Sequence, residues 1–151
     1  MQKLKILNKK EIKKILEIIK NQWGCDVNLD YAFLMNKENK IYIVNKEISK
    51  VDFSKLRINS VGLYFATMQG NELRLSIEGS QIIGPKAKKN ILELDEKETK
   101  EWLKGIDLEK ETKEKGFVII KHDDDFLGCG KAVEKKVLNY VPKARRIAVN
   151  N

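Results

Sequence analysis

The feature that most constrains the fold is a helical period near the N-terminus, followed by short runs typical of strands. Asn8 and Glu11 match a capping box, and Gly24 follows as a stop signal, so the pattern predicts a helix over residues 9–22. Lysines fall largely on the other faces of this helix. Its predicted apolar face consists of Ile12, Ile15, Leu16, Ile19 and Trp23.

Strand-like runs fill the rest of the first half. Residues 31–35 and 40–44 predict one hairpin, and residues 61–68 and 73–75 predict a second. A short helical turn is expected at 52–56. One helix followed by four antiparallel strands makes this half an α+β unit.

The second half mixes strands with short helices. Ser76 is expected to cap a helix over 77–83, and Asp95 with Glu98 forms a second capping box before a helix over 96–104. This pattern predicts a small barrel with crossover helices, giving an α+β chain with domains 1–75 and 76–151. Its strands are expected at 90–94, 117–121, 126–133, 137–141 and 146–149, with 108–115 as a loop or helical turn.

Composition narrows the class of protein. The chain has 151 residues, of which 42% are apolar and 34% charged, as in a folded and well-solvated protein. Its apolar runs, such as 117–120, are far shorter than the roughly 20 residues of a membrane span. No secretion signal is recognisable, so Cys25 and Cys129 are expected as reduced thiols in the cytoplasm.

Positive charge is concentrated at the two ends of the chain. The net charge is +8; residues 1–20 and 129–151 each carry +5, which leaves −2 for residues 21–128. A basic surface favours a polyanionic partner, most often nucleic acid. The two ends are therefore expected to share one face as a continuous RNA track. Solvation by lysine-rich helix faces remains the alternative for the first segment.

Motifs for catalysis and for nucleotide or metal binding are incomplete. A P-loop ending at Gly130 and Lys131 would need glycine where Asp125 stands and serine or threonine where Ala132 stands. His122 and the three aspartates after it form one turn, which cannot direct all four side chains at one ion. No nucleophile–base–orienter set accompanies His122 or either cysteine. The sequence therefore predicts no cofactor, no metal and no catalytic residue.

The C-terminal run has features suited to an RNA surface. Glycines let the backbone approach a phosphate closely, lysine and arginine neutralise phosphates, and tyrosine stacks on an unpaired base. The alternative is a basic C-terminal strand and tail with the tyrosine in the core. The residues with these properties are Gly128, Gly130, Lys131, Tyr140, Lys143, Arg145 and Arg146.

Several segments together resemble PUA-like RNA-binding domains. They are residues 76–90, 116–120, the Gly-Cys-Gly-Lys segment 126–131 and the Asn-Tyr-Val-Pro-Lys segment 139–146. The likeness is greatest to the C-terminal PUA-like domain of RNA cytosine-C5 methyltransferases of the NOL1/NOP2/Sun group. The resemblance implies a β pseudo-barrel and adds Lys86, Lys88, Lys89 and Asn139 to the expected RNA-binding residues. The catalytic Pro-Cys or Thr-Cys loop of that group is not found around Cys25 or Cys129.

The expected function is therefore non-catalytic RNA binding, as an accessory factor in tRNA or rRNA modification or ribosome biogenesis. The expected partners are structured RNA and a separate RNA methyltransferase or ribosome-assembly factor, with no membrane. Two alternatives remain open. One is a small enzyme of RNA metabolism with a site between the halves that uses His122 or Cys129, and the other is a protein-interaction subunit of an RNA-processing complex.

Overall fold

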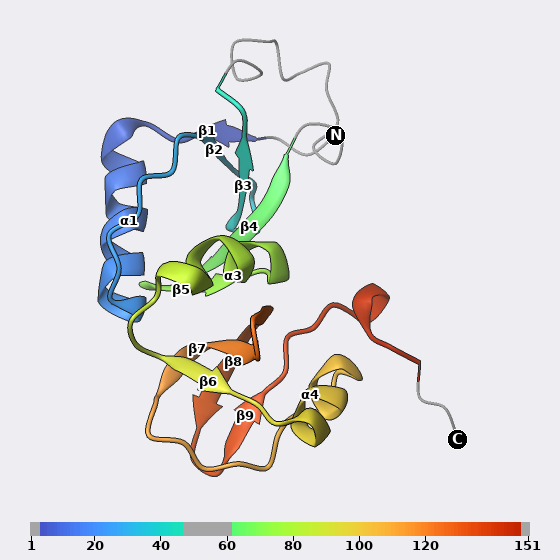
Figure 1. Ribbon diagram of the computed structural model, residues 1–151. Helices are drawn as coiled ribbons and strands as arrows, with labels where there is room; N and C mark the ends of the chain where they lie inside the picture. Colours follow the sequence, from blue (N-terminus) through green and yellow to red (C-terminus); the bar gives the residue numbers. More distant parts are fainter. Residues whose placement is uncertain (1–3, 47–61, 149–151) are drawn as a thin grey trace.

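A five-stranded antiparallel sheet and one long helix form the first half of the chain. The structure, a computed structural model, describes residues 4–46 and 62–148. The sheet has the order β1-β2-β3-β4-β5. Its helix α1 (Lys9–Trp23) runs along one side of the molecule (Figure 1). The strands are β1 (Lys5–Ile6), β2 (Ala32–Met35), β3 (Lys40–Val44), β4 (Leu63–Gln69) and β5 (Glu72–Leu75).

The second half contains a four-stranded mixed sheet with the order β6-β7-β8-β9. The strands β6 and β7 pair in parallel, and the remaining neighbours are antiparallel. The helix α4 (Glu96–Leu103) provides part of the crossover from β6 to β7. The strands are β6 (Ile91–Glu93), β7 (Gly116–His122), β8 (Asp125–Val133) and β9 (Lys136–Leu138).

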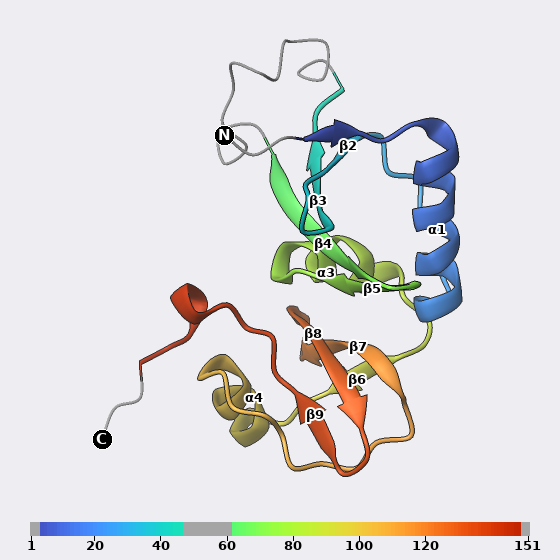
Figure 2. The ribbon, with the colours of Figure 1, turned by 180° about the vertical axis from the view of Figure 1, so that it is seen from behind.

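A short helical connection joins the sheets. Helix α3 (Ile77–Ile83) and the 3-10 helix η3 (Gly84–Lys86) lie between them, and both ribbon views show α3 between β4 and β8 (Figures 1 and 2). The Ser76 hydroxyl accepts a hydrogen bond from the Gly79 N–H at the start of α3. A second 3-10 helix, η4 (Lys143–Arg145), follows β9 near the C-terminus.

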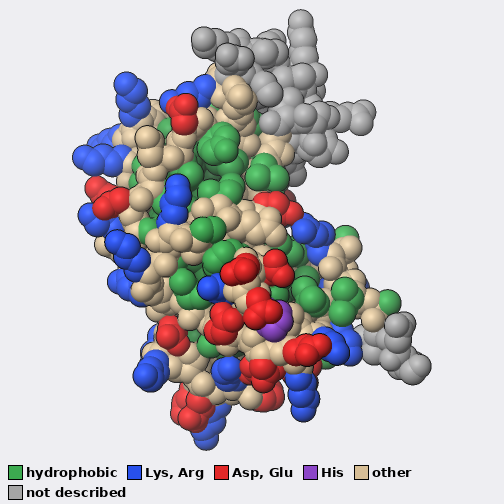
Figure 3. Space-filling view, viewed as in Figure 1, with side chains coloured by type: hydrophobic (Ala, Val, Ile, Leu, Met, Phe, Trp, Pro, Cys, Tyr) green, Lys and Arg blue, Asp and Glu red, His purple; other side chains and the backbone are tan. Residues whose placement is uncertain are grey.

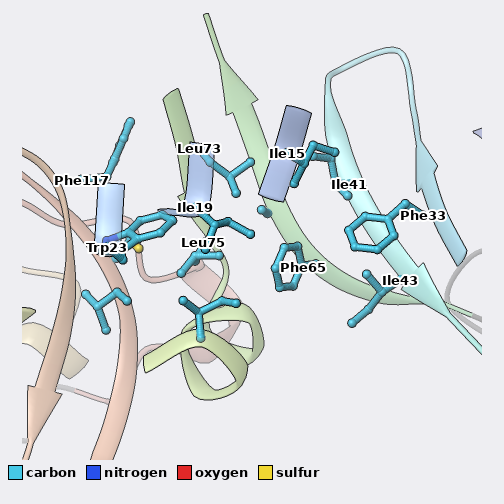
Figure 4. Close-up of a cluster of buried hydrophobic side chains, with 14 of the residues drawn as sticks. Ile15, Ile19, Trp23, Phe33, Ile41, Ile43, Phe65, Leu73, Leu75 and Phe117 are labelled. Atoms are coloured by element: carbon cyan, nitrogen blue, oxygen red, sulfur yellow. The ribbon is translucent and has the colours of Figure 1, made fainter. Parts of the chain in front are cut away.

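Strand β7 is buried on both faces and joins two hydrophobic clusters. Phe117 and Ile119 belong to the cluster that also contains Ile19 and Leu75 of the first half. The alternate residues of β7 face a second cluster, which is built around Trp102. Figure 4 shows the first cluster, where Trp23, Leu75 and Phe117 lie together. The two halves therefore share one continuous core.

Most of the predicted elements are confirmed. The helices begin and end within about a residue of the predicted bounds, and both capping boxes are present. The fold class is α+β as predicted, and the second sheet is open over the described residues. The helical turn expected at 52–56 lies outside the described residues. The two-residue strand β1 and the parallel pairing of β6 with β7 were not predicted.

The predicted last strand at 146–149 is wrong over its described residues, 146–148. At the sheet edge, Leu108 already bridges Val137 of β9. The chain instead turns towards α4, where the Ile147 N–H donates to the Leu103 carbonyl at 2.9 Å. This bond satisfies a carbonyl that the end of a helix leaves free.

We expect the two halves to unfold in one transition, because β7 contributes to both clusters. The fluorescence of Trp23 reports on the first half and that of Trp102 on the second. The variant Trp23→Phe therefore keeps only the reporter of the second half, and Trp102→Phe keeps only that of the first. In each variant the fluorescence and far-ultraviolet circular dichroism transitions should coincide. Two separated transitions in either variant would show that the halves fold independently.

The shared core also predicts a large effect of one substitution. Ile119→Ala should lower the free energy of unfolding by about 2–5 kcal/mol, because Ile119 is fully buried. Val133→Ala on the neighbouring strand is the matched control, since its side chain is 39% exposed. Its effect should be below about 0.5 kcal/mol. Urea denaturation measures both.

Candidate functional site

One basic surface follows helix α1 and the loop after η3. We call it the α1 surface; in Figure 3 the lysines along that edge of the molecule form a blue border. The loop is held against the helix end, because the backbone N–H groups of Lys88 and Lys89 donate to the Trp23 carbonyl at 2.8 and 3.3 Å. Cations are favourable at this negative end of a helix. The α1 surface consists of Lys9, Lys10, Lys13, Lys14, Lys20, Lys86, Lys88 and Lys89, all exposed.

A second basic surface is the C-terminal segment, residues 143–146. Lys143, Arg145 and Arg146 are exposed, but two of them also make contacts within the protein. The Arg145 Nη1 lies 2.6 Å from a carboxylate oxygen of Glu78 on α3. The Arg146 Nε donates to the Val141 carbonyl at 3.1 Å. These bonds fix the segment against the body of the protein.

The two surfaces lie on opposite sides of the molecule. Both ribbon views separate α1 from η4 across the full width of the fold (Figures 1 and 2). The prediction of one continuous track is therefore wrong. Helix α1 and the segment after β9 lie on different sides of the joined sheets, which sequence charge alone does not reveal.

A pocket of about 260 Å³ lies between the two halves. Tyr64 and Arg74 line it from the first sheet, while Leu127, Tyr140 and Arg145 line it from the second half. We call it the interdomain pocket. Its position brings Tyr140 and Arg145, two of the predicted RNA-binding residues, together with residues from the other half.

Aromatic rings and cations alternate beside this pocket. The Arg74 guanidinium carbon lies 4.3 Å from the centroid of the Tyr140 ring. The Tyr140 ring packs on Phe117 with centroids 6.1 Å apart, and the Lys131 Nζ lies 5.5 Å from the Phe117 centroid. Such cation–ring contacts are favourable, more so when they are shielded from water. The predicted residues Lys131 and Tyr140 are thus held by packing.

Gly128 and Gly130 make their close approaches within the protein. Both are buried, and the Gly128 N–H donates to the Ser80 hydroxyl at 2.8 Å. A Cβ at Gly130 would lie 2.7 Å from Val137 Cγ1 and 2.8 Å from the Trp102 ring. The structure thus gives both glycines a packing role, and their contact with RNA stays a prediction.

Asn139 is used to join the segment after β9 to the end of α4. Its amide nitrogen donates to the carbonyls of Trp102 and Ile106 at 2.9 and 3.0 Å. Its amide oxygen accepts from the Val141 N–H at 2.8 Å. Both amide N–H donors are therefore committed within the protein, while RNA contact by this residue also stays a prediction.

Cys129 lines the interdomain pocket, but its thiol lacks the lowered pKa of a nucleophilic cysteine. Burial raises the pKa of its thiol to about 12, an effect opposed by the backbone of Leu75 and the charge of Arg74. The pKa of Cys25 is also raised, chiefly by burial. Thiols rather than thiolates are therefore expected at neutral pH.

His122 lies in an acidic part of the surface, where red side chains surround it in Figure 3. Its Nδ1 hydrogen-bonds the Leu94 carbonyl at 2.8 Å. That bond is the main cause of a raised pKa; partial burial opposes it, and the nearby Asp123, Glu93 and Glu96 add to it. The imidazole is thus bound to the backbone at the far end of β7 from Gly116.

The architecture is that of an α+β protein with an antiparallel first sheet and a mixed second sheet. Residues 89–147 match the family model described as the PUA domain of the methyltransferase RsmF. The chain thus contains a PUA domain of the type found in these methyltransferases, which confirms the resemblance predicted from sequence.

Curated relatives support the family match, and their alignments cover more of the chain than residues 89–147. Three of them share the name ribosomal RNA small subunit methyltransferase F. The chain is 22% identical over 107 residues to the one from Vibrio vulnificus strain YJ016, covering 71% of the chain and 22% of the relative. It is 28% identical over 111 residues to that of Aeromonas salmonicida strain A449, covering 73% and 23%.

The third relative matches a longer stretch of the chain. The protein from Vibrio cholerae serotype O1 strain M66-2 is 23% identical over 135 residues, which is 89% of the chain and 28% of the relative. The matched stretch thus spans about a quarter of each relative. It includes much of the first half as well as the PUA domain.

Sequence reasoning missed Arg74, Tyr64 and Glu78. Arg74 alternates with buried Leu73 and Leu75, a pattern that ordinarily marks a solvent-facing side chain. Arg74 lies against Tyr140 because β5 packs beside the second half of the protein, although the two residues are 66 positions apart in the chain. No local pattern signals such a contact.

The described structure also contains no helix long and apolar enough to cross a membrane.

We expect both thiols to react slowly in the folded protein. The reactive species is the thiolate, and with a pKa of about 12 Cys129 would be ionised in roughly one molecule in ten thousand at pH 8. A chromogenic disulfide reagent should modify both cysteines rapidly only in guanidinium chloride. Cys25→Ser isolates Cys129, and rapid stoichiometric labelling of that folded variant would contradict this expectation.

Proposed function

We propose that this protein binds structured RNA as a non-catalytic module in rRNA modification. Small-subunit rRNA is the favoured RNA because the relatives are named for its methylation, and tRNA is the alternative. The observation that carries the proposal is the PUA match over residues 89–147. The proposed partner is a separate RNA methyltransferase or ribosome-assembly factor, and the proposed location is the cytoplasm.

The C-terminal segment is the surface we assign to RNA phosphates within the PUA domain. Lys143 and Arg145 are exposed, and the 3-10 helix η4 presents them together. Lysine provides a point charge, while the planar guanidinium of arginine can contact two phosphate oxygens. The α1 surface supports a second, more diffuse contact on the other side of the protein.

The interdomain pocket favours one rival function, a small enzyme of RNA metabolism. Cys129 is the pocket residue that this alternative would use, and its raised pKa makes it a poor nucleophile. His122, the other proposed catalytic group, is not among the residues that line this pocket, and its Nδ1 bonds the Leu94 carbonyl. The pocket therefore supports binding better than thiol or histidine chemistry. Turnover of bound RNA that is lost in Cys129→Ala would favour the enzyme.

We expect Lys143→Ala/Arg145→Ala to weaken binding to a small-subunit rRNA fragment. Binding releases fewer counterions when a phosphate contact is lost. The slope of log affinity against log salt should therefore become shallower by about 0.7–0.9 per contact. Fluorescence anisotropy across a salt series measures affinity and slope. Crosslinking and sequencing of RNA from the native cell should recover small-subunit rRNA.

A charge-matched variant controls for the loss of net charge. Lys97→Ala/Lys100→Ala removes two positive charges from exposed positions on α4, outside both the C-terminal segment and the α1 surface. Its affinity should stay close to that of the wild type. If the two double variants bind equally well and with equal slopes, the C-terminal segment does not contact phosphates. The α1 surface would then be the better candidate.

A further inference from the structure

Arg74 is a half-buried cation at the interdomain pocket. Within residues 4–46 and 62–148, no carboxylate lies within ion-pair distance of its guanidinium, and no hydrogen bond to it is formed. Its one specific contact is the face of the Tyr140 ring, at 4.3 Å. A charge taken partly out of water is costly unless it is paired.

Several other polar groups of the pocket are bonded within the protein. The Ser76 hydroxyl donates to the backbone carbonyls of Tyr64 and Phe65 and accepts from Gly79. The Tyr64 hydroxyl contacts the Thr67 hydroxyl. Glu78 is the acidic residue among the described residues that line the pocket, and its carboxylate forms an ion pair with Arg145 at 2.6 Å. Of the two arginines that line the pocket, Arg145 is paired with Glu78, whereas Arg74 has no ion-pair partner among the described residues.

The shape and lining suit a small anion with an apolar neighbour. A volume of about 260 Å³ lies just below the roughly 300–1,000 Å³ of pockets for drug-sized ligands. Ile77, Leu127 and Val141 form apolar wall beside the guanidinium. A phosphate with the ribose or base of one nucleotide has this combination of charge and apolar surface.

We propose that the interdomain pocket binds one unpaired nucleotide of an RNA strand, with its phosphate on Arg74. This inference rests on the proposed RNA-binding function and adds a contact from the first half of the chain. A duplex cannot enter, because a paired and stacked nucleotide does not reach into a pocket of this size. The bound strand must therefore be single-stranded or bulged at this point.

The ion pair between Arg145 and Glu78 lies at the same pocket and sets a second expectation. A phosphate on Arg74 brings negative charge close to Glu78, which disfavours binding by like-charge repulsion. Glu78→Gln should therefore bind an unpaired strand more tightly than the wild type. Glu109→Gln is the matched control, because Glu109 forms an exposed ion pair with Lys136 at 3.8 Å and does not line the pocket.

The central test compares Arg74→Met with the wild type, using a ten-nucleotide uridine oligomer and a duplex of equal length. Methionine keeps much of the apolar stem and removes the charge. Loss of a charge-assisted contact should weaken binding of the single strand about tenfold and lower its salt slope by about 0.7. Duplex binding should change little. Arg74→Lys should give an intermediate loss, since it keeps the charge without the planar fork.

Lys97→Met controls for net charge, and thermal unfolding of each variant checks the fold. If Arg74→Met is poorly folded, the Arg74 Nε–H resonance of the wild type gives the test, assigned by its absence in Arg74→Lys. It should shift on addition of the oligomer and not with an equal concentration of inorganic phosphate. No shift with the oligomer, or equal binding by folded Arg74→Met, overturns the pocket assignment alone. A wild type that binds neither RNA overturns the proposed function as well.

Discussion

Burial of β7 on both faces is the constraint on which the rest of this structure depends. Its residues 117–120 are all buried, and they alternate between a cluster shared with the first sheet and a cluster around Trp102. A strand covered on both faces reads as a continuous apolar run rather than an alternating one. Because β7 lies against both halves, the position of β5 relative to β8 is set by core packing. The interdomain pocket and the contact between Arg74 and Tyr140 follow from that arrangement.

The sequence predicted those parts of the fold whose causes are local. The capping boxes at Asn8 and Asp95 each involve residues three positions apart, so the helix starts could be recognised directly. Elements that depend on distant partners were missed or misassigned. The strand β1 exists because it pairs with β2, and β6 lies parallel to β7 across an intervening helix. The strand predicted at 146–149 does not form over its described residues, because Leu108 already bridges Val137 at the sheet edge and Ile147 bonds the end of α4 instead.

The same distinction applies to the candidate site. Charge is a property of each residue, so the exposed lysines of the Lys86–Lys89 loop and the C-terminal segment could be chosen from sequence. The use of each hydrogen-bonding group is a property of the fold. The amide N–H groups of Asn139 bond two carbonyls at the end of α4, and the Gly128 N–H bonds Ser80. Neither commitment has a sequence signal, since each partner lies more than 30 residues away.

The two kinds of basic surface differ in what they can contribute to binding. The lysines of the α1 surface are exposed and strongly hydrated, so their attraction to a polyanion is diffuse and falls with salt. Arg74 is half-buried, and its guanidinium lies against the Tyr140 ring, which restrains it. A restrained donor loses less conformational entropy on binding, and the lower local dielectric strengthens its bond to an anion. Affinity can therefore come from either surface, whereas discrimination between paired and unpaired nucleotides can come only from a site with a defined shape.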